Sequence, residues 1–164
     1  MKKIAYSIFS FILLLFINGC VGYEPIFGST NLQFEIADYS IEGNKILGNK
    51  IYSKLYSISK SKKDDQNSRS GDLVIKGSKD KNVTTKDSAG KILQYKITLN
   101  TDVKVTDFIT KDKILNQIFI SSSIYNVQNK FSDTVNLENQ TIESLLNKTY
   151  QELLIRLSQN IITK

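Results

Sequence analysis

The chain has 164 residues, with 22 Lys and Arg against 16 Asp and Glu and a formal net charge of +6. It contains no histidine and one cysteine, which excludes His-based catalytic triads, histidine-containing metal sites and an intramolecular disulfide. The length suits a single domain with a full hydrophobic core. The mild basicity suits a solvated surface or an anionic ligand, and dispersed basic residues do not favour nucleic acid.

The N-terminus has the layout of an export signal. Lys2 and Lys3 precede an apolar run over 4–17, which is shorter than the about 20 residues that a membrane-spanning helix needs. The residues that follow, INGC at 17–20, resemble the lipobox of bacterial lipoproteins, whose cysteine is acylated and becomes the mature N-terminus. We therefore predict a lipoprotein signal peptide over 1–19, with an ordinary signal peptide as the alternative.

Acylation also gives the lone cysteine a chemical role. A covalent diacylglycerol and an N-acyl chain such as palmitate on Cys20 would anchor the protein firmly, and we expect no other cofactor. Val21 stands where lipoproteins kept at the inner membrane often carry Asp. By resemblance to that sorting rule, the expected location is the outer membrane, and removal of Lys2 and Lys3 leaves a net charge of +4.

The first half of the mature chain predicts a tether, a strand and a helix. The segment 20–30 contains the only proline and two glycines of GYEPIFG, and it reads as a lipidated N-terminus and short tether. Alternating apolar residues predict a strand over 31–41. Asn44 is a suitable N-cap for an amphipathic helix over 45–60, and a polar loop over 59–71 follows.

Three strands and a second helix complete the single domain expected over 31–164. A strand begins near 73, and DSAG at 87–90 predicts a hairpin turn. The return strand over 91–107 alternates over its whole length, so the hairpin tip around 80–92 is expected to project beyond the core. The last two elements are a strand over 114–128, with apolar residues on both faces, and an apolar-striped helix over 138–162.

These elements predict an α+β fold. Two amphipathic helices would pack on one face of a four-stranded, mostly antiparallel sheet, in the order β-α-β-β-β-α. No phosphate-binding glycine loop is present, and the adjacent acids Asp64 and Asp65 lie in a charged loop sequence. We therefore expect a protein that is not an enzyme, although a periplasmic hydrolase that uses two carboxylates remains a weaker alternative.

The whole arrangement resembles the LptE family, small lipoproteins of the outer-membrane lipopolysaccharide assembly complex. Three stretches carry the likeness together with the element order: Gly19-Cys20 followed by GYEPIFG at 22–28, SIYN at 123–126, and LIRL at 154–157. The resemblance implies two helices on a four-stranded sheet. It also implies a plug inside the β-barrel partner LptD that assists barrel assembly, contacts lipopolysaccharide and catalyses no reaction.

Lysines near the projecting hairpin are the candidate contacts for lipid A phosphates or for acidic groups of the barrel. No local motif transfers the family's own basic contacts to particular residues. The candidates are Lys76, Lys79, Lys81, Lys86, Lys91 and Lys96.

The alternative function is a generic outer-membrane lipoprotein that binds another envelope protein or peptidoglycan.

Overall fold

The structure is a computed structural model that describes residues 34–60 and 69–162. The predicted signal peptide, Cys20 and the tether lie outside the described residues, as does most of the loop predicted over 59–71. Among the described residues, no helix is long and apolar enough to cross a membrane.

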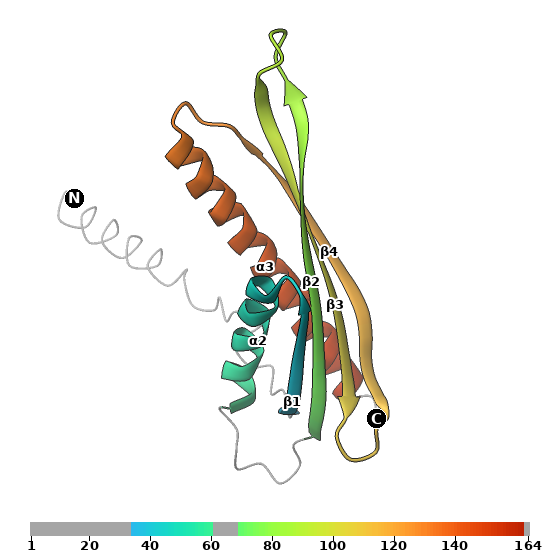
Figure 1. The fold of residues 1–164 in the computed structure, drawn as a ribbon. Coiled ribbons are helices and arrows are strands. Elements are labelled where there is room, and N and C mark those ends of the chain that lie inside the picture. Colours follow the sequence, from blue (N-terminus) through green and yellow to red (C-terminus); the bar gives the residue numbers. More distant parts are fainter. Residues whose placement is uncertain (1–33, 61–68, 163–164) are drawn as a thin grey trace, which may run out of the picture. The chain divides into compact units, whose positions relative to one another are not determined.

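Six elements form a two-layer domain (Figure 1), and they confirm the predicted α+β fold and element order. They are β1 (Phe34–Gly43), α2 (Lys45–Lys60), β2 (Arg69–Lys86), β3 (Ile92–Asp107), β4 (Lys113–Asn126) and α3 (Phe131–Ile162). The strands lie in the sheet in chain order, β1-β2-β3-β4. The β1–β2 pair is parallel and the other two pairs are antiparallel, so the sheet is mostly antiparallel.

Helix α2 connects the parallel strands and begins where the sequence predicts. The Asn44 side-chain oxygen accepts a hydrogen bond from the Leu47 backbone N–H at 3.2 Å, which makes Asn44 the N-cap. Gly43 before it has a φ of +68°, a left-handed conformation that glycine adopts without strain. Leu47, Ile51 and Leu55 form the predicted apolar stripe and are buried against the sheet.

Strand β3 shows the predicted alternation. Its helix-facing residues from Ile97 to Val105 are at most 1% exposed, whereas Lys104 on the other face is open to solvent. They pack with a row of leucines from α3, namely Leu145, Leu146, Leu153, Leu154 and Leu157. Together with the α2 stripe, these residues form one apolar core between the sheet and the two helices.

Two element boundaries among the described residues differ from the prediction by four residues or more, and the others differ by at most two. Helix α3 begins at Phe131, seven residues before the predicted start at 138. None of the apolar side chains in its first two turns is fully buried, and these turns are held by polar contacts, so hydrophobic periodicity does not reveal them. Strand β2 begins at Arg69, four residues before the predicted start, because residues 69–72 pair with β1 and β3.

Strand β4 forms one edge of the sheet and has an apolar row on each face. Phe119 and Tyr125 are buried beneath α3, whereas Ile118, Ile120 and Ile124 are 55–66% exposed on the other face. No helix among the described residues covers that outer face. The apolar residues on both faces of this strand therefore reflect one covered face and one open face.

Candidate functional site

The β2–β3 hairpin is closed by the predicted turn at 87–90. The Asp87 carboxylate accepts hydrogen bonds from the backbone N–H groups of Ala89 and Lys91, at 2.9 and 2.8 Å. Gly90 supplies the positive φ of +83° that the turn requires. The β3–β4 pairing ends at Gln94 and Asn126, so the hairpin tip extends beyond β4 (Figure 1). The projecting part is shorter than the predicted 80–92, because residues 80–83 pair with the part of β3 that also pairs with β4.

The first turns of α3 lie next to this hairpin, and Thr134 fixes the connection that leads into them. The Thr134 hydroxyl accepts a hydrogen bond from the Gln128 backbone N–H at 2.8 Å and lies 3.3 Å from the Lys130 carbonyl oxygen. Thr134 is only 8% exposed. This contact fixes the connection from β4 into α3 and sets where the helix begins.

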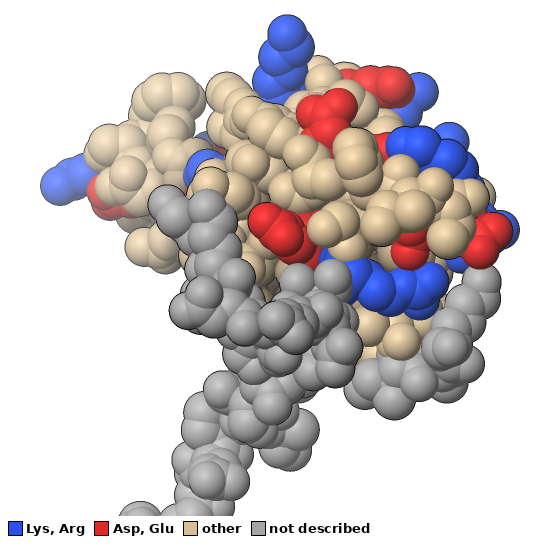
Figure 2. Space-filling model, turned by 90° about the horizontal axis from the view of Figure 1, so that it is seen from below, with Lys and Arg blue, Asp and Glu red and all other residues tan. Residues whose placement is uncertain are grey.

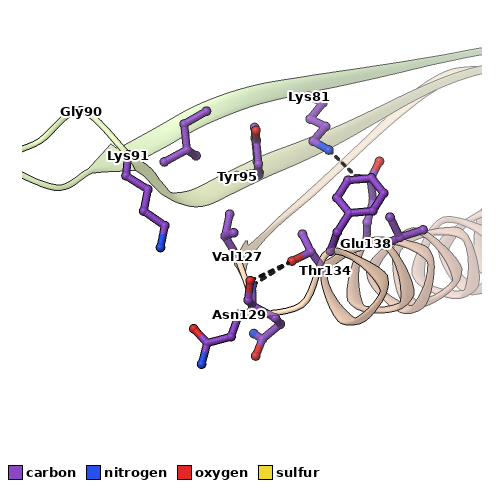
Figure 3. Close-up of a pocket in the computed structure, with 12 residues that line it drawn as sticks. Lys81, Gly90, Lys91, Tyr95, Val127, Asn129, Thr134 and Glu138 are labelled. Carbon is purple, nitrogen blue, oxygen red and sulfur yellow. Dashed lines mark hydrogen bonds and ion pairs between the residues drawn. The ribbon is translucent and has the colours of Figure 1, made fainter.

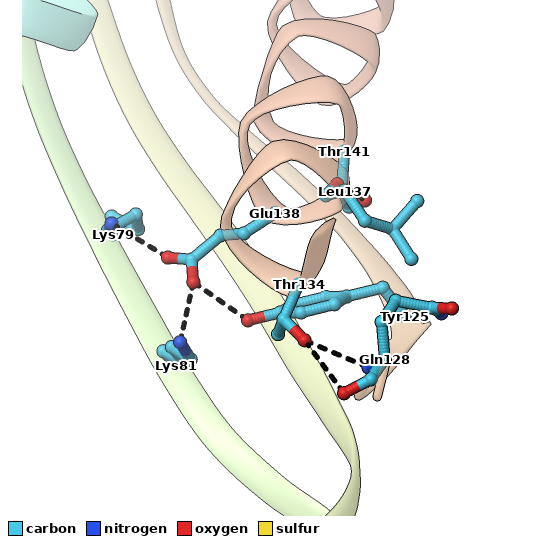
Figure 4. A network of polar contacts seen from close by, with 8 residues as sticks. All are labelled: Lys79, Lys81, Tyr125, Gln128, Thr134, Leu137, Glu138 and Thr141. Carbon is cyan, nitrogen blue, oxygen red and sulfur yellow. Dashed lines mark hydrogen bonds and ion pairs between the residues drawn. The ribbon is translucent and has the colours of Figure 1, made fainter. Parts of the chain in front are cut away.

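Glu138 joins α3 to β2 and β4 through three side chains (Figure 4). Its carboxylate accepts hydrogen bonds from the Tyr125 hydroxyl at 2.8 Å and from the Lys81 ammonium at 2.5 Å. The Lys79 ammonium lies 3.5 Å away. Lys81 also sits 4.3 Å from the Tyr95 ring centroid, a favourable cation–π distance. Lys79, Lys81, Tyr125 and Glu138 are called the Glu138 network below.

The pKa shifts of the network follow from these contacts. Burial alone would raise the pKa of Glu138, but hydrogen bonds from Lys81 and Tyr125 and the lysine charges outweigh it and hold that pKa below its usual range. Burial likewise opposes the charged form of Lys81, yet Glu138 and Tyr125 raise the Lys81 pKa. Both groups are therefore charged near neutral pH and stabilise each other.

A groove of about 540 Å³ lies between the hairpin and the start of α3 (Figure 3); we call it the hairpin-end groove. The walls are mostly apolar, formed by Ile92, Tyr95, Val127, Phe131 and Val135. Two lysines, Lys81 and Lys91, border it. In Figure 3, Lys91 extends from the hairpin toward the segment that carries Val127 and Asn129.

The two lysines of the groove differ in their partners. The Lys81 ammonium forms an ion pair with the Glu138 carboxylate, whereas Lys91 is exposed and has no ion pair with a carboxylate among the described residues. Phe131 is 83% exposed at the same place. The groove thus offers an unshielded cation beside exposed apolar surface, which suits a ligand with an anionic group and hydrocarbon chains.

The structure does not bring the six candidate lysines into one surface. Lys79 and Lys81 face α3 and bind Glu138, whereas Lys76 and Lys96 lie on the open face of the sheet. Lys76 is 4.0 Å from Glu42, in the middle of the sheet and away from the hairpin tip. The other four lysines are divided between two surfaces because side chains alternate between the two faces of a strand. Of the six candidates, only Lys86 and Lys91 belong to the exposed tip.

Several residues of the groove are absent from the sequence-based candidates. Phe131 and Val135 lie in the part of α3 that hydrophobic periodicity misses, and Glu138 was predicted only as the start of the helix. Ser132 and Asp133 could have indicated the earlier start, since an acid in the first turn complements the helix dipole. Among the described residues, no three acidic or thiol side chains cluster as metal ligands.

Solved bacterial lipoproteins share this fold. Rare lipoprotein B from Shewanella oneidensis superposes with a TM-score of 0.54 and 12% identity, over 77% of this chain and 98% of its own. Lipoprotein B from Nitrosomonas europaea gives 0.54 and 10%, over 75% and 83%. A minor lipoprotein from Acinetobacter baumannii gives 0.52 and 11%, over 79% and 92%.

No family model matches the sequence, and no curated protein matches it closely enough to be significant. The likeness to the three lipoproteins is therefore one of fold, at identities where sequence similarity carries little information.

Proposed function

We propose that this chain is an outer-membrane lipoprotein, anchored through acylated Cys20, that binds lipopolysaccharide at the hairpin-end groove. In this proposal it associates with the barrel protein LptD as its plug, assists barrel assembly and takes part in lipopolysaccharide delivery to the outer leaflet. The shared fold of three bacterial lipoproteins and the resemblance to the LptE family support it.

The observation that carries the proposal is the composition of the hairpin-end groove. Lipid A combines phosphate groups with acyl chains, so a complementary site needs cations next to apolar walls. Lys91 supplies a cation without a carboxylate partner in the described chain, and Phe131 supplies exposed apolar surface beside it. Lys86, on the same hairpin tip, is a second exposed cation that could reach a phosphate.

The role proposed for the site is binding rather than catalysis. Among the described residues, the one carboxylate that lines the groove is Glu138, which accepts hydrogen bonds from Lys81 and Tyr125 and is held ionised. A carboxylate with its oxygens engaged and its pKa lowered is poorly suited to act as a general acid near neutral pH. This supports a non-enzymatic function.

Lipopolysaccharide binding tests the groove directly. We expect Lys91→Glu combined with Phe131→Ser to weaken the affinity of the purified protein for lipopolysaccharide by about tenfold or more, which corresponds to about 1.4 kcal/mol. Lys81 is left unchanged because it holds α3 to the hairpin. The matched control is Lys96→Glu, an exposed lysine on the open face of the sheet. Equal affinity in the groove variant and the wild type would contradict the proposed site.

Partnership with LptD is tested by co-purification from mildly solubilised envelopes. Recovery of LptD with the lipoprotein supports the plug role. Recovery of peptidoglycan or of another envelope protein without LptD would favour the generic lipoprotein instead.

A further inference from the structure

A short turn at the end of the domain opposite the hairpin exposes two adjacent apolar side chains. It connects β3 to β4 over residues 108–112 and is called the lower turn below. Ile109 is 84% exposed and Phe108 is 47% exposed. Single exposed apolar residues are common on protein surfaces, but turns are usually built from small and polar residues. Two adjacent large apolar residues at this position therefore call for a contact that covers them.

The lower turn is held by hydrogen bonds that backbone N–H groups donate to Asp107. The Asp107 carboxylate accepts the backbone N–H groups of Ile109 and Thr110, both at 3.0 Å, and lies 3.2 Å from Arg69. The Phe108 N–H binds the carbonyl oxygen of Ser70 at 2.9 Å. These hydrogen bonds fix the backbone of the turn, so the Ile109 side chain is exposed in the folded domain.

The first described residue of the chain lies at this same end. Phe34 begins β1 and is paired with Arg69, which binds Asp107 at the base of the lower turn. The 14 residues from Cys20 to residue 33 precede it and can span at most about 50 Å. An acyl group on Cys20 would therefore bring this end of the domain within reach of the bilayer. The hairpin tip is separated from this end by the length of β3.

The charges around the lower turn fit an interfacial position. The Lys111 ammonium lies 4.7 Å from the centre of the Phe108 ring and 3.0 Å from the Asp72 carboxylate, and exposed Lys113 follows two residues later. Aromatic and lysine side chains are suited to the boundary between hydrocarbon and water. Figure 2 views this end and shows basic side chains interspersed with acidic ones, so apolar contact rather than a block of positive charge would drive the docking.

We propose that the lower turn docks on the surface of the bilayer that holds acylated Cys20. Ile109 and Phe108 enter the boundary between headgroups and acyl chains, and Lys113 faces lipid phosphates. The inference rests on the anchor at Cys20, which is part of the proposed function. It describes the lipoprotein before it joins a barrel, with the hairpin-end groove directed away from the bilayer surface.

A tryptophan reporter tests the docking, because the chain contains no tryptophan. Full-length acylated Ile109→Trp is incorporated into vesicles of phosphatidylethanolamine and phosphatidylglycerol with brominated acyl chains. We expect its emission to shift to shorter wavelength and to be quenched at least twofold relative to vesicles without bromine. The matched control is Ala89→Trp at the exposed hairpin tip, which should stay unquenched.

The possible failures are distinguishable. Flotation of the wild-type protein with vesicles, compared with Cys20→Ala, tests the anchor by itself: equal flotation of the two would overturn the anchor, and failure of the wild-type protein to float would overturn both the anchor and the docking. Vesicle-bound Ile109→Trp that is quenched no more than Ala89→Trp would overturn the docking alone. Equal thermal unfolding of both reporters and the wild type verifies that the substitutions leave the fold intact.

Discussion

Helix α3 is held to the sheet in two different ways along its length. Toward its C-terminal end, leucines such as Leu146 and Leu153, both fully buried, pack on the apolar face of the sheet. Toward its N-terminal end, the Glu138 network and the Thr134 contact replace apolar packing with hydrogen bonds and charge. The first contact supplies most of the stability, whereas the second holds the start of the helix beside the hairpin and thereby shapes the groove.

The largest effect is expected from breaking the apolar contact. Leu146→Ala should lower the free energy of unfolding by about 2–5 kcal/mol, because it removes a fully buried side chain and leaves a cavity. Denaturant unfolding of the purified protein measures the change. The control is Asn147→Ala on the exposed side of α3, expected to stay within about 0.5 kcal/mol. A loss below 1 kcal/mol for Leu146→Ala would mean that the core relaxes around the missing side chain.

A smaller effect is expected from breaking the polar contact. Glu138→Gln should lower the free energy of unfolding by about 1–2 kcal/mol, since Lys81 and Lys79 lose their carboxylate partner but remain partly solvated. Lipopolysaccharide affinity should fall as well if the network positions the groove.

Glu143→Gln is the matched control for Glu138→Gln. Glu143 pairs with Lys50 across the two helices, but both side chains are more than 40% exposed, so the change should stay within about 0.5 kcal/mol. Equal losses in the two variants would show that the partial burial of Glu138 adds nothing.

The pH dependence is the smallest expected effect and isolates the charge of Glu138. Because its pKa is lowered on folding, the carboxylate stabilises the fold above the ordinary value of 4.5, and this contribution is lost as the pH falls from there through the lowered folded pKa. The stability difference between wild type and Glu138→Gln should therefore be constant from pH 6 to 8 and shrink at acid pH. A difference that grows at acid pH would contradict this assignment.

The difference between local patterns and distant contacts explains which parts of the fold and of the groove could be predicted from the sequence. The stripe of α2, the Asn44 cap, the turn at 87–90 and the alternation of β3 are local patterns, and each is confirmed. The position of the first turns of α3 beside β2 depends on the contact between Glu138 and Lys81, 57 residues apart, which no local pattern records. Strand alternation could have separated Lys76 and Lys96 from Lys79 and Lys81, because they differ in parity along paired strands.

The order of the strands in the sheet has a consequence for how the domain folds. Each strand pairs only with strands next to it in the chain, so the β2–β3 and β3–β4 hairpins can form through short loops. β1 joins in parallel through the α2 crossover, and α3 makes the most distant contacts, such as the 96-residue separation between Tyr150 and Lys54. Because local contacts close with less loss of chain entropy, we expect the two hairpins to form early in folding and α3 to dock last, completing the hairpin-end groove only in the final step.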